Sequence, residues 1–157
     1  MLNRFLTLFG VLLFLGSGAA FAANSATFNV TVTIRTPITV TKVTDLDFGT
    51  VESVIATYTV NAVAGTGSPT HSAGATAVAA SFTVSGEAGQ TANVTLTPST
   101  VTATSGANNV SITLSPEANT YTFPGSGTFF VGGSVSLVGT EVSGVYTGSS
   151  TLQLLYQ

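Results

Sequence analysis

The stretch Phe28-Asn-Val-Thr-Val-Thr-Ile-Arg35 alternates strictly between apolar and polar residues. Successive side chains of an extended chain point to opposite faces, so the stretch predicts a β-strand over residues 26–35 with one wholly apolar face. That face carries Phe28, Val30, Val32 and Ile34. Pro37 then interrupts the pattern, because proline cannot donate to a sheet ladder. We therefore expect residues 23–36 to form an amino-terminal arm and residues 37–157 to form a β-domain.

The rest of the chain also has an all-β composition. Thr, Val, Ser and Gly are poor helix formers, whereas Val, Thr, Phe and Tyr favour strands. Turn signals recur at the short spacing that is typical of β-sandwiches. Further strands are predicted near residues 37–44, 54–62, 77–85, 91–98, 108–114, 119–123, 127–138 and 145–156. Hairpin turns are expected at Ser85–Gly89 and Gly106–Asn109, and an exposed, mobile loop at residues 64–75.

The last predicted strand closes the sequence. Four of its residues share one parity and therefore one face: Tyr146, Leu152, Leu154 and Tyr156. No polar tail follows them, and a strand in this position leaves an edge that something must cover. We therefore expect a protein that is completed by another chain.

The first 22 residues predict a secretory signal peptide. Arg4 supplies the positive flank, residues 5–15 form an apolar run, and Ala20-Phe-Ala22 fits the small-x-small cleavage rule. The run is about a dozen residues, short for a membrane span. A retained membrane anchor is the alternative. Cleavage after Ala22 would give a protein secreted through the inner membrane.

Composition excludes several classes of function. Charged residues make up 6% of the chain, against about 25% in an ordinary soluble domain. With three basic residues and a net charge of -3, the chain lacks what binding to a phosphate backbone requires, so nucleic acid is excluded as a partner. The absence of cysteine removes disulfides, thiolate catalysis and cysteine metal sites. So neutral a surface suits packing against copies of the same chain.

The chain offers little for catalysis, and we expect neither an enzyme nor a cofactor or metal site. His71, the only histidine, falls in the predicted loop. Asp45 and Asp47 share strand parity, as a glycosidase pair or two calcium ligands would. We favour the alternative, a solvated rim beside buried Leu46 and Phe48, because no third ligand is nearby in sequence.

Five stretches carry a family resemblance: Thr36-Pro-Ile-Thr-Val-Thr-Lys42, Asp45-Leu-Asp-Phe-Gly-Thr50, Phe82-Thr-Val-Ser-Gly-Glu-Ala-Gly89, Phe130-Val-Gly-Gly-Ser-Val135 and Gly144-Val-Tyr-Thr-Gly148. In order and spacing they resemble secreted bacterial β-domains labelled Mat/Ecp-type fimbrial major subunits. The ending Leu154-Leu-Tyr-Gln157 is similar to the ends of chaperone–usher pilins. The resemblance implies an immunoglobulin-like β-sandwich that lacks one strand. It also implies a periplasmic chaperone, an outer-membrane usher, and completion by the arm of the next subunit.

These patterns together predict a structural subunit of a cell-surface fimbrium or pilus, a homopolymer built by donor-strand exchange. Residues 25–35 would pair beside the 145–156 strand of a neighbour by β-strand addition. Two alternatives remain open. The arm could pair within its own chain, which would give a closed monomer. The protein could instead be a self-contained binding module for carbohydrate or surface adhesion, with Tyr58 or Tyr121 as an aromatic platform.

Overall fold

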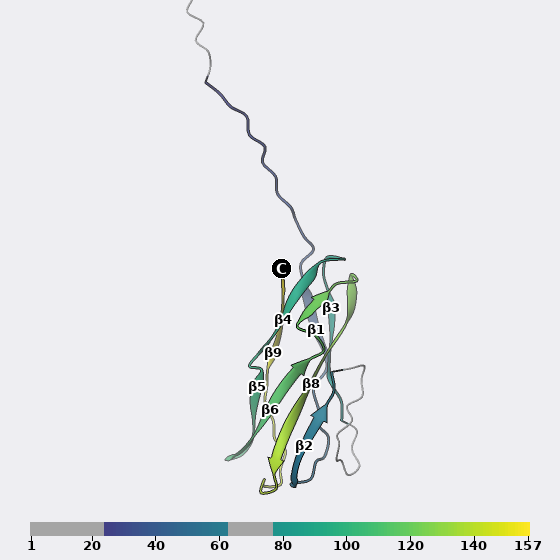
Figure 1. Ribbon diagram of the computed structural model, residues 1–157, viewed down its shortest axis with the longest axis vertical. Helices are drawn as coiled ribbons and strands as arrows, with labels where there is room; N and C mark the ends of the chain where they lie inside the picture. The colour runs from purple at the N-terminus through teal and green to yellow at the C-terminus, as the bar shows by residue number, and fades with distance from the viewer. Residues whose placement is uncertain (1–23, 63–76) are drawn as a thin grey trace, which may run out of the picture. The chain divides into compact units, whose positions relative to one another are not determined.

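A computed structural model describes residues 24–62 and 77–157 of the chain (Figure 1). These residues form antiparallel strands and contain no helix, so none of them provides a helix that could span a membrane. The predicted all-β class is confirmed, and the two sheets form a β-sandwich. The predicted signal peptide, the 64–75 loop and His71 lie outside the described residues.

Nine strands are formed within the described ranges. They are β1 (Thr39–Thr44), β2 (Ile55–Val60), β3 (Ala80–Ser85), β4 (Thr91–Thr97), β5 (Thr100–Ser105), β6 (Asn108–Pro116), β7 (Thr120–Thr122), β8 (Ser126–Val138) and β9 (Thr151–Tyr156). The larger sheet has the order β1-β3-β8-β6-β5, with β2 also paired to β8, and the smaller sheet has the order β7-β4-β9.

The long strand β8 organises the larger sheet. Its first half pairs with β3 and its second half with β2, so two strands follow one another along β8. Gly132 lies where β3 gives way to β2. A Cβ at Gly132 would run into the backbone of Val60 and would lie 2.7 Å from the Ala62 nitrogen. Glycine at this position therefore allows β2 to approach β8 closely enough to pair.

Three predicted elements differ from the structure. Ser85–Gly89 is not a hairpin turn, because β3 pairs with β1 and β8 while β4 pairs with β7 and β9; the turn carries the chain from one sheet to the other. Strand β5 was not predicted, since its inward residues, Val101 and Ala103, give only a weak apolar signal. The last strand begins at Thr151, later than residue 145. The predicted Gly106–Asn109 hairpin is confirmed between β5 and β6.

Buried side chains form three separate clusters, whereas a domain of this size usually has one contiguous core. The largest lies between the sheets and contains Phe123, Phe129 and Leu154. A second surrounds Tyr58 and Leu137. The third contains Val60 with two alanines. Partly buried side chains bridge the clusters: Leu46 packs against the first and the third, and Phe48 against the second and the third.

Residues 24–33 belong to a unit of the chain separate from Ile34–Gln157, and they adopt no regular secondary structure. The strand predicted over residues 26–35 is therefore not formed by the single chain. Its apolar side chains are largely exposed: Phe28 by 84%, Val30 by 80%, Val32 by 79% and Ile34 by 88%. The arm thus exposes four large apolar side chains at alternate positions.

Candidate functional site

A groove of about 920 Å³ opens along the β-sandwich. Residues 42–53, which end β1 and continue beyond it, form one rim, and residues 141–150, which lead into β9, form the other. The floor is almost entirely apolar. Its residues are Ala80, Phe82, Leu96, Val101, Val110, Ile112, Leu114, Val131, Val135 and Leu137, with Leu152 beside the second rim.

The groove adjoins two unpaired strand edges. Among the described strands β1 pairs only with β3, and β9 pairs only with β4. β1 contributes Lys42 to the groove lining and β9 contributes Leu152. An unpaired edge presents free N–H and C=O groups, which an extended segment can bind. The site therefore offers main-chain hydrogen bonding together with an apolar floor.

The floor also separates two of the core clusters. Leu114 and Leu152 pack against the cluster that contains Phe129, whereas Ile112 packs against the cluster around Tyr58. All three side chains are only partly buried. An apolar segment in the groove would cover them and join the two clusters. The groove therefore exposes apolar side chains that belong to two core clusters.

Residues 38–156 match the sequence profile of a family described as a domain of unknown function, DUF4402. The chain belongs to the DUF4402 family. The matched region contains β1 to β9 and begins after the apolar arm. No match was found among curated proteins or among solved structures.

The structure places the four predicted groove-strand residues in three different settings. Tyr146 and Leu152 line the groove of the DUF4402 domain. Leu154 lies in the main core and is 8% exposed. Tyr156 packs edge-on against Phe123, with ring centroids 5.6 Å apart, and its hydroxyl contacts the base of the arm. The alternation of β9 correctly predicted that Leu152, Leu154 and Tyr156 lie on one inward face. Of these three residues, only Leu152 lines the groove.

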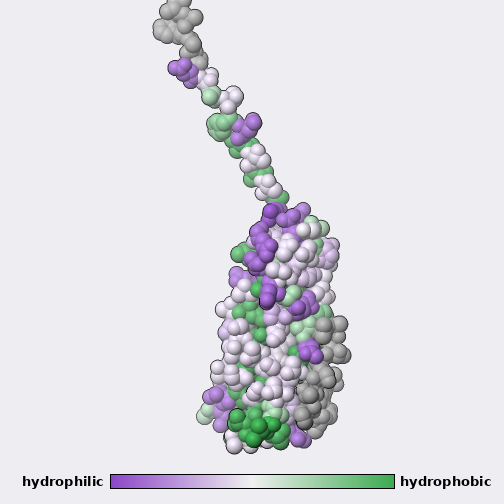
Figure 2. All heavy atoms as spheres, viewed as in Figure 1, coloured by the Kyte–Doolittle hydropathy of each residue, from purple (hydrophilic) through white to green (hydrophobic). Residues whose placement is uncertain are grey.

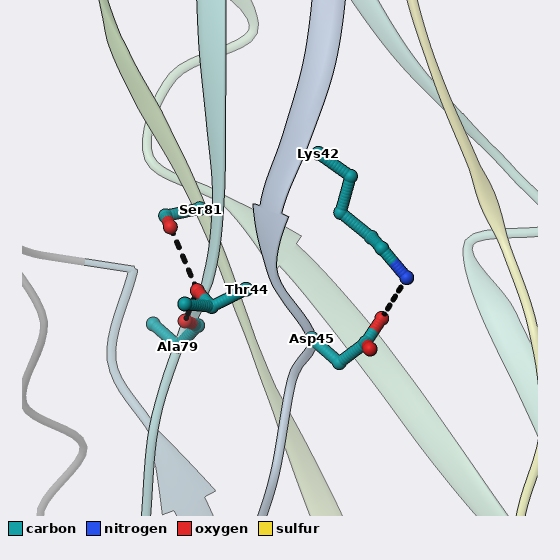
Figure 3. Close-up of polar contacts among 5 residues, drawn as sticks. All are labelled: Lys42, Thr44, Asp45, Ala79 and Ser81. Carbon is teal, nitrogen blue, oxygen red and sulfur yellow. Dashed lines mark hydrogen bonds and ion pairs between the residues drawn. The ribbon is translucent and has the colours of Figure 1, made fainter.

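The two aspartates of the groove rim have structural roles. Lys42 Nζ lies 2.7 Å from Asp45 Oδ1 in an exposed ion pair (Figure 3). Asp47 Oδ1 accepts a hydrogen bond of 2.7 Å from the Gly49 N–H. The described residues contain no cluster of side chains that could hold a metal ion. The structure thus favours the solvated rim for the two aspartates. Leu46 and Phe48, which were expected to be buried beside them, are only partly buried and line the groove.

Side-chain hydrogen bonds fix the end of β1 on the sheet. Thr44 Oγ1 lies 2.7 Å from Ser81 Oγ and donates to the Ala79 carbonyl oxygen at 3.2 Å (Figure 3). A register shift between Lys42 and Thr44 accompanies these contacts. Beyond the shift the chain stays paired with the segment before β3, since Asp47 and Val78 exchange two backbone hydrogen bonds of 2.8 Å. These contacts hold the groove rim against the larger sheet.

Glu141 joins the two rims at one end of the groove. Its Oε1 accepts the Val138 N–H at 2.6 Å, and its Oε2 accepts the Gly139 N–H and the Ser53 hydroxyl, each at 2.9 Å. These hydrogen bonds, that from Val138 above all, lower the pKa of Glu141 from its ordinary value of 4.5 to about 2. Glu141 was not predicted to have this role, since its only local signal is a glycine two positions earlier.

Substituting Glu141 is expected to change the response of the DUF4402 domain to acid. Because the pKa of Glu141 is lowered to about 2, its ionised form stabilises the fold above pH 4.5, and this contribution is lost as the pH falls towards 2. Glu141→Gln should therefore lose Tm at pH 7 and flatten the pH dependence of Tm between 4.5 and 2. Thermal melts of both proteins across this range test the prediction, which parallel curves would contradict.

The base of the arm is fixed to the domain through Thr36. The Thr36 N–H donates to Glu87 Oε2 at 3.1 Å, and Tyr156 Oη donates to the Thr36 carbonyl oxygen at 2.8 Å. The same hydroxyl accepts the Glu87 N–H at 2.6 Å. Side-chain and backbone hydrogen bonds from Thr36 hold the pKa of Glu87 below its ordinary value. A Cβ at Gly86 would lie 2.6 Å from Tyr156 Oη, so glycine leaves room for this network.

Proposed function

We propose that the protein is a structural subunit of a bacterial surface fimbrium, a homopolymer in which the arm of one copy fills the groove of the next. The observation that carries the proposal is the open groove with two unpaired strand edges beside it. The same chain carries a segment with one apolar face, which is exposed in the single molecule. Groove and arm thus have complementary chemistry. The Mat/Ecp-type resemblance of the sequence supports the same proposal.

The lengths of arm and groove also agree. From Phe28 to Ile34 an extended chain spans roughly 20 Å at about 3.3 Å per residue. Lys42 lies near one end of the groove. It pairs with Phe82 on β3, which pairs with Phe129 on β8, so Phe129 lies at the same level. Leu137, further along β8, lies near the other end. The nine residues of β8 from Phe129 to Leu137 span roughly 26 Å. All four apolar residues of the arm therefore fit along the floor.

The expected stabilisation is large for a domain of this size. Burying each of the four apolar side chains contributes about 1.5–3 kcal/mol, or roughly 6–12 kcal/mol together. The total stability of a small domain is about 5–15 kcal/mol. Completion by a neighbour would therefore change the subunit from marginal to durable. Because the contact is head to tail, it does not close and yields an open filament.

A carbohydrate-binding module receives less support. Tyr58 is fully buried, and its hydroxyl donates to the Glu52 carbonyl oxygen at 2.9 Å. Tyr121 is partly buried and packs edge-on against Phe123 and Phe129. Neither ring presents an open face of the kind that stacks on a sugar.

The proposal includes export and assembly partners. A periplasmic chaperone would cover the groove before assembly, and an outer-membrane usher would deliver the subunit to the cell surface. The groove supports the first of these roles because an unfilled apolar floor needs cover.

Microscopy of the purified mature protein tests the proposed function. We expect long threads by negative stain and a high-molecular-weight fraction by size exclusion. The same protein without residues 23–35 should give only single particles. Threads that persist without the arm, or a mature protein that remains monomeric at high concentration, would overturn the proposal.

A further inference from the structure

One end of the sandwich carries a group of exposed apolar side chains outside the core. Val54 is exposed by 40%, Ile55 by 87%, Val138 by 66% and Val142 by 57%. Ile55 and Val138 are paired across β2 and β8, so these side chains gather where β2 begins and β8 ends. Figure 2 shows a dense apolar area at this lower end of the domain. We call these four residues the distal patch.

The distal patch lies at the opposite end of the domain from the base of the arm. Thr39 pairs with Ser85, and Ser85 pairs with Ser126, the first residue of β8. Val138, in the distal patch, is the last residue of the same strand. Twelve steps of an extended chain separate the two ends by roughly 40 Å. The arm therefore leaves the domain at one end, and the patch occupies the other.

The patch continues the groove. Val142 belongs to both, and Leu137, beside Val138, lines the groove floor. The carboxylate of Glu141, which precedes Val142 in the chain, accepts hydrogen bonds from Val138, Gly139 and Ser53. The negative charge of Glu141 is thus satisfied by these three donors and faces the turn after β8. An apolar surface of this kind, continuous with a proposed binding groove, indicates a second contact with the same partner.

The arm is attached to its own domain by a very short connection. Thr36 is held by Glu87 and Tyr156, and Ile34, the last apolar residue of the arm, is only two residues away. Two residues span at most roughly 7 Å. A copy whose arm fills a groove must therefore bring its own root end, the surface around Thr36 and Ala88, against one end of that groove.

We propose that the distal patch is the surface that receives the root end of the next copy, with Ile34 of that copy packed against it. The inference rests on the proposed function. It requires the arm to run antiparallel to β9, because β9 runs towards the root end of its own domain. If the arm ran parallel to β9 instead, the root end of one copy would meet the root end of the next, and the distal patch would remain exposed. The second contact would fix the angle between successive subunits.

Cross-linking within filaments tests this arrangement, since the chain contains no cysteine of its own. Filaments of the double variant Ala88→Cys, Val142→Cys are treated with a short thiol-specific bismaleimide and separated by denaturing electrophoresis. We expect a ladder of covalent oligomers. The matched control is Ala88→Cys, Thr95→Cys, whose second thiol lies on the exposed face of β4, midway along the domain. It should remain monomeric.

Each outcome bears on a different claim. Filaments of the first variant that give no ladder would overturn the distal contact but leave donor-strand exchange intact. Covalent dimers from Ala88→Cys alone would place two root ends together and would also overturn it. Failure of the unsubstituted mature protein to form filaments would overturn the proposed function, and this inference with it.

Discussion

Val32→Asp is expected to abolish filament assembly while the isolated subunit folds as before. Val32 lies on the apolar face of the arm and is 79% exposed in the single chain, so the substitution removes no contact there. In the filament it would place an unpaired carboxylate on an apolar floor, a change that costs several kcal/mol. A loss of about 4 kcal/mol weakens each contact roughly 1,000-fold. Pelleting and negative-stain microscopy measure the loss, and thermal melting of the monomer verifies the fold.

The neighbouring residue provides a matched control. Thr33→Asp introduces the same charge one position later, on the polar face of the arm, where the side chain would remain hydrated. Filaments of this variant should form nearly as well as those of the parent protein. Equal loss of assembly by both variants would indicate a general effect of charge and would contradict a specific orientation of the arm in the groove.

A synthetic peptide of residues 24–36 is expected to stabilise the domain that lacks residues 23–35. The peptide would cover the groove floor and pair with the free strand edges, so it binds the folded state alone. At a hundred times its dissociation constant, such a ligand adds about 2.7 kcal/mol to the free energy of unfolding. For a domain of this size that corresponds to a rise in Tm of roughly 10 °C. Thermal melts over a peptide titration measure the rise.

The control peptide has the same composition but exchanges Val30 with Thr31 and Val32 with Thr33. The exchange moves two apolar side chains to the opposite face of the strand. It should raise Tm much less than the parent sequence does. Similar shifts from the two peptides would show that hydrophobicity alone drives binding and would contradict strand addition in a defined register.

The sequence predicted most strands because their alternation reports burial on one face directly. The clearest examples are β8 and the inward face of β9, where parity alone places Leu152, Leu154 and Tyr156 together. Strand β5 was missed because a short Thr-rich segment with small inward residues alternates too weakly. The turn after Ser85 was misassigned because local turn chemistry does not specify which strands pair across it.

The groove could be predicted only in part. The apolar arm and the terminal strand suggested an incomplete sandwich, and Leu46 and Phe48 were correctly singled out as inward residues. Their partial exposure along the groove depends on long-range contacts, which no local pattern records. The hydrogen bonds of Glu141 and of Tyr156 likewise join residues 88 and 120 positions apart, respectively. Only the folded chain brings such partners together.

The attachment of Thr36 has a mechanical consequence for a fibre under tension. A pull on residue 35 passes along the covalent chain into β1, and Tyr156 of β9 shares it through the carbonyl oxygen of Thr36. β1 pairs with β3 in the larger sheet, and β9 pairs with β4 in the smaller one. A pull along the strands would therefore load the ladders of both sheets, and the rungs of each ladder would have to fail together for its strands to slide.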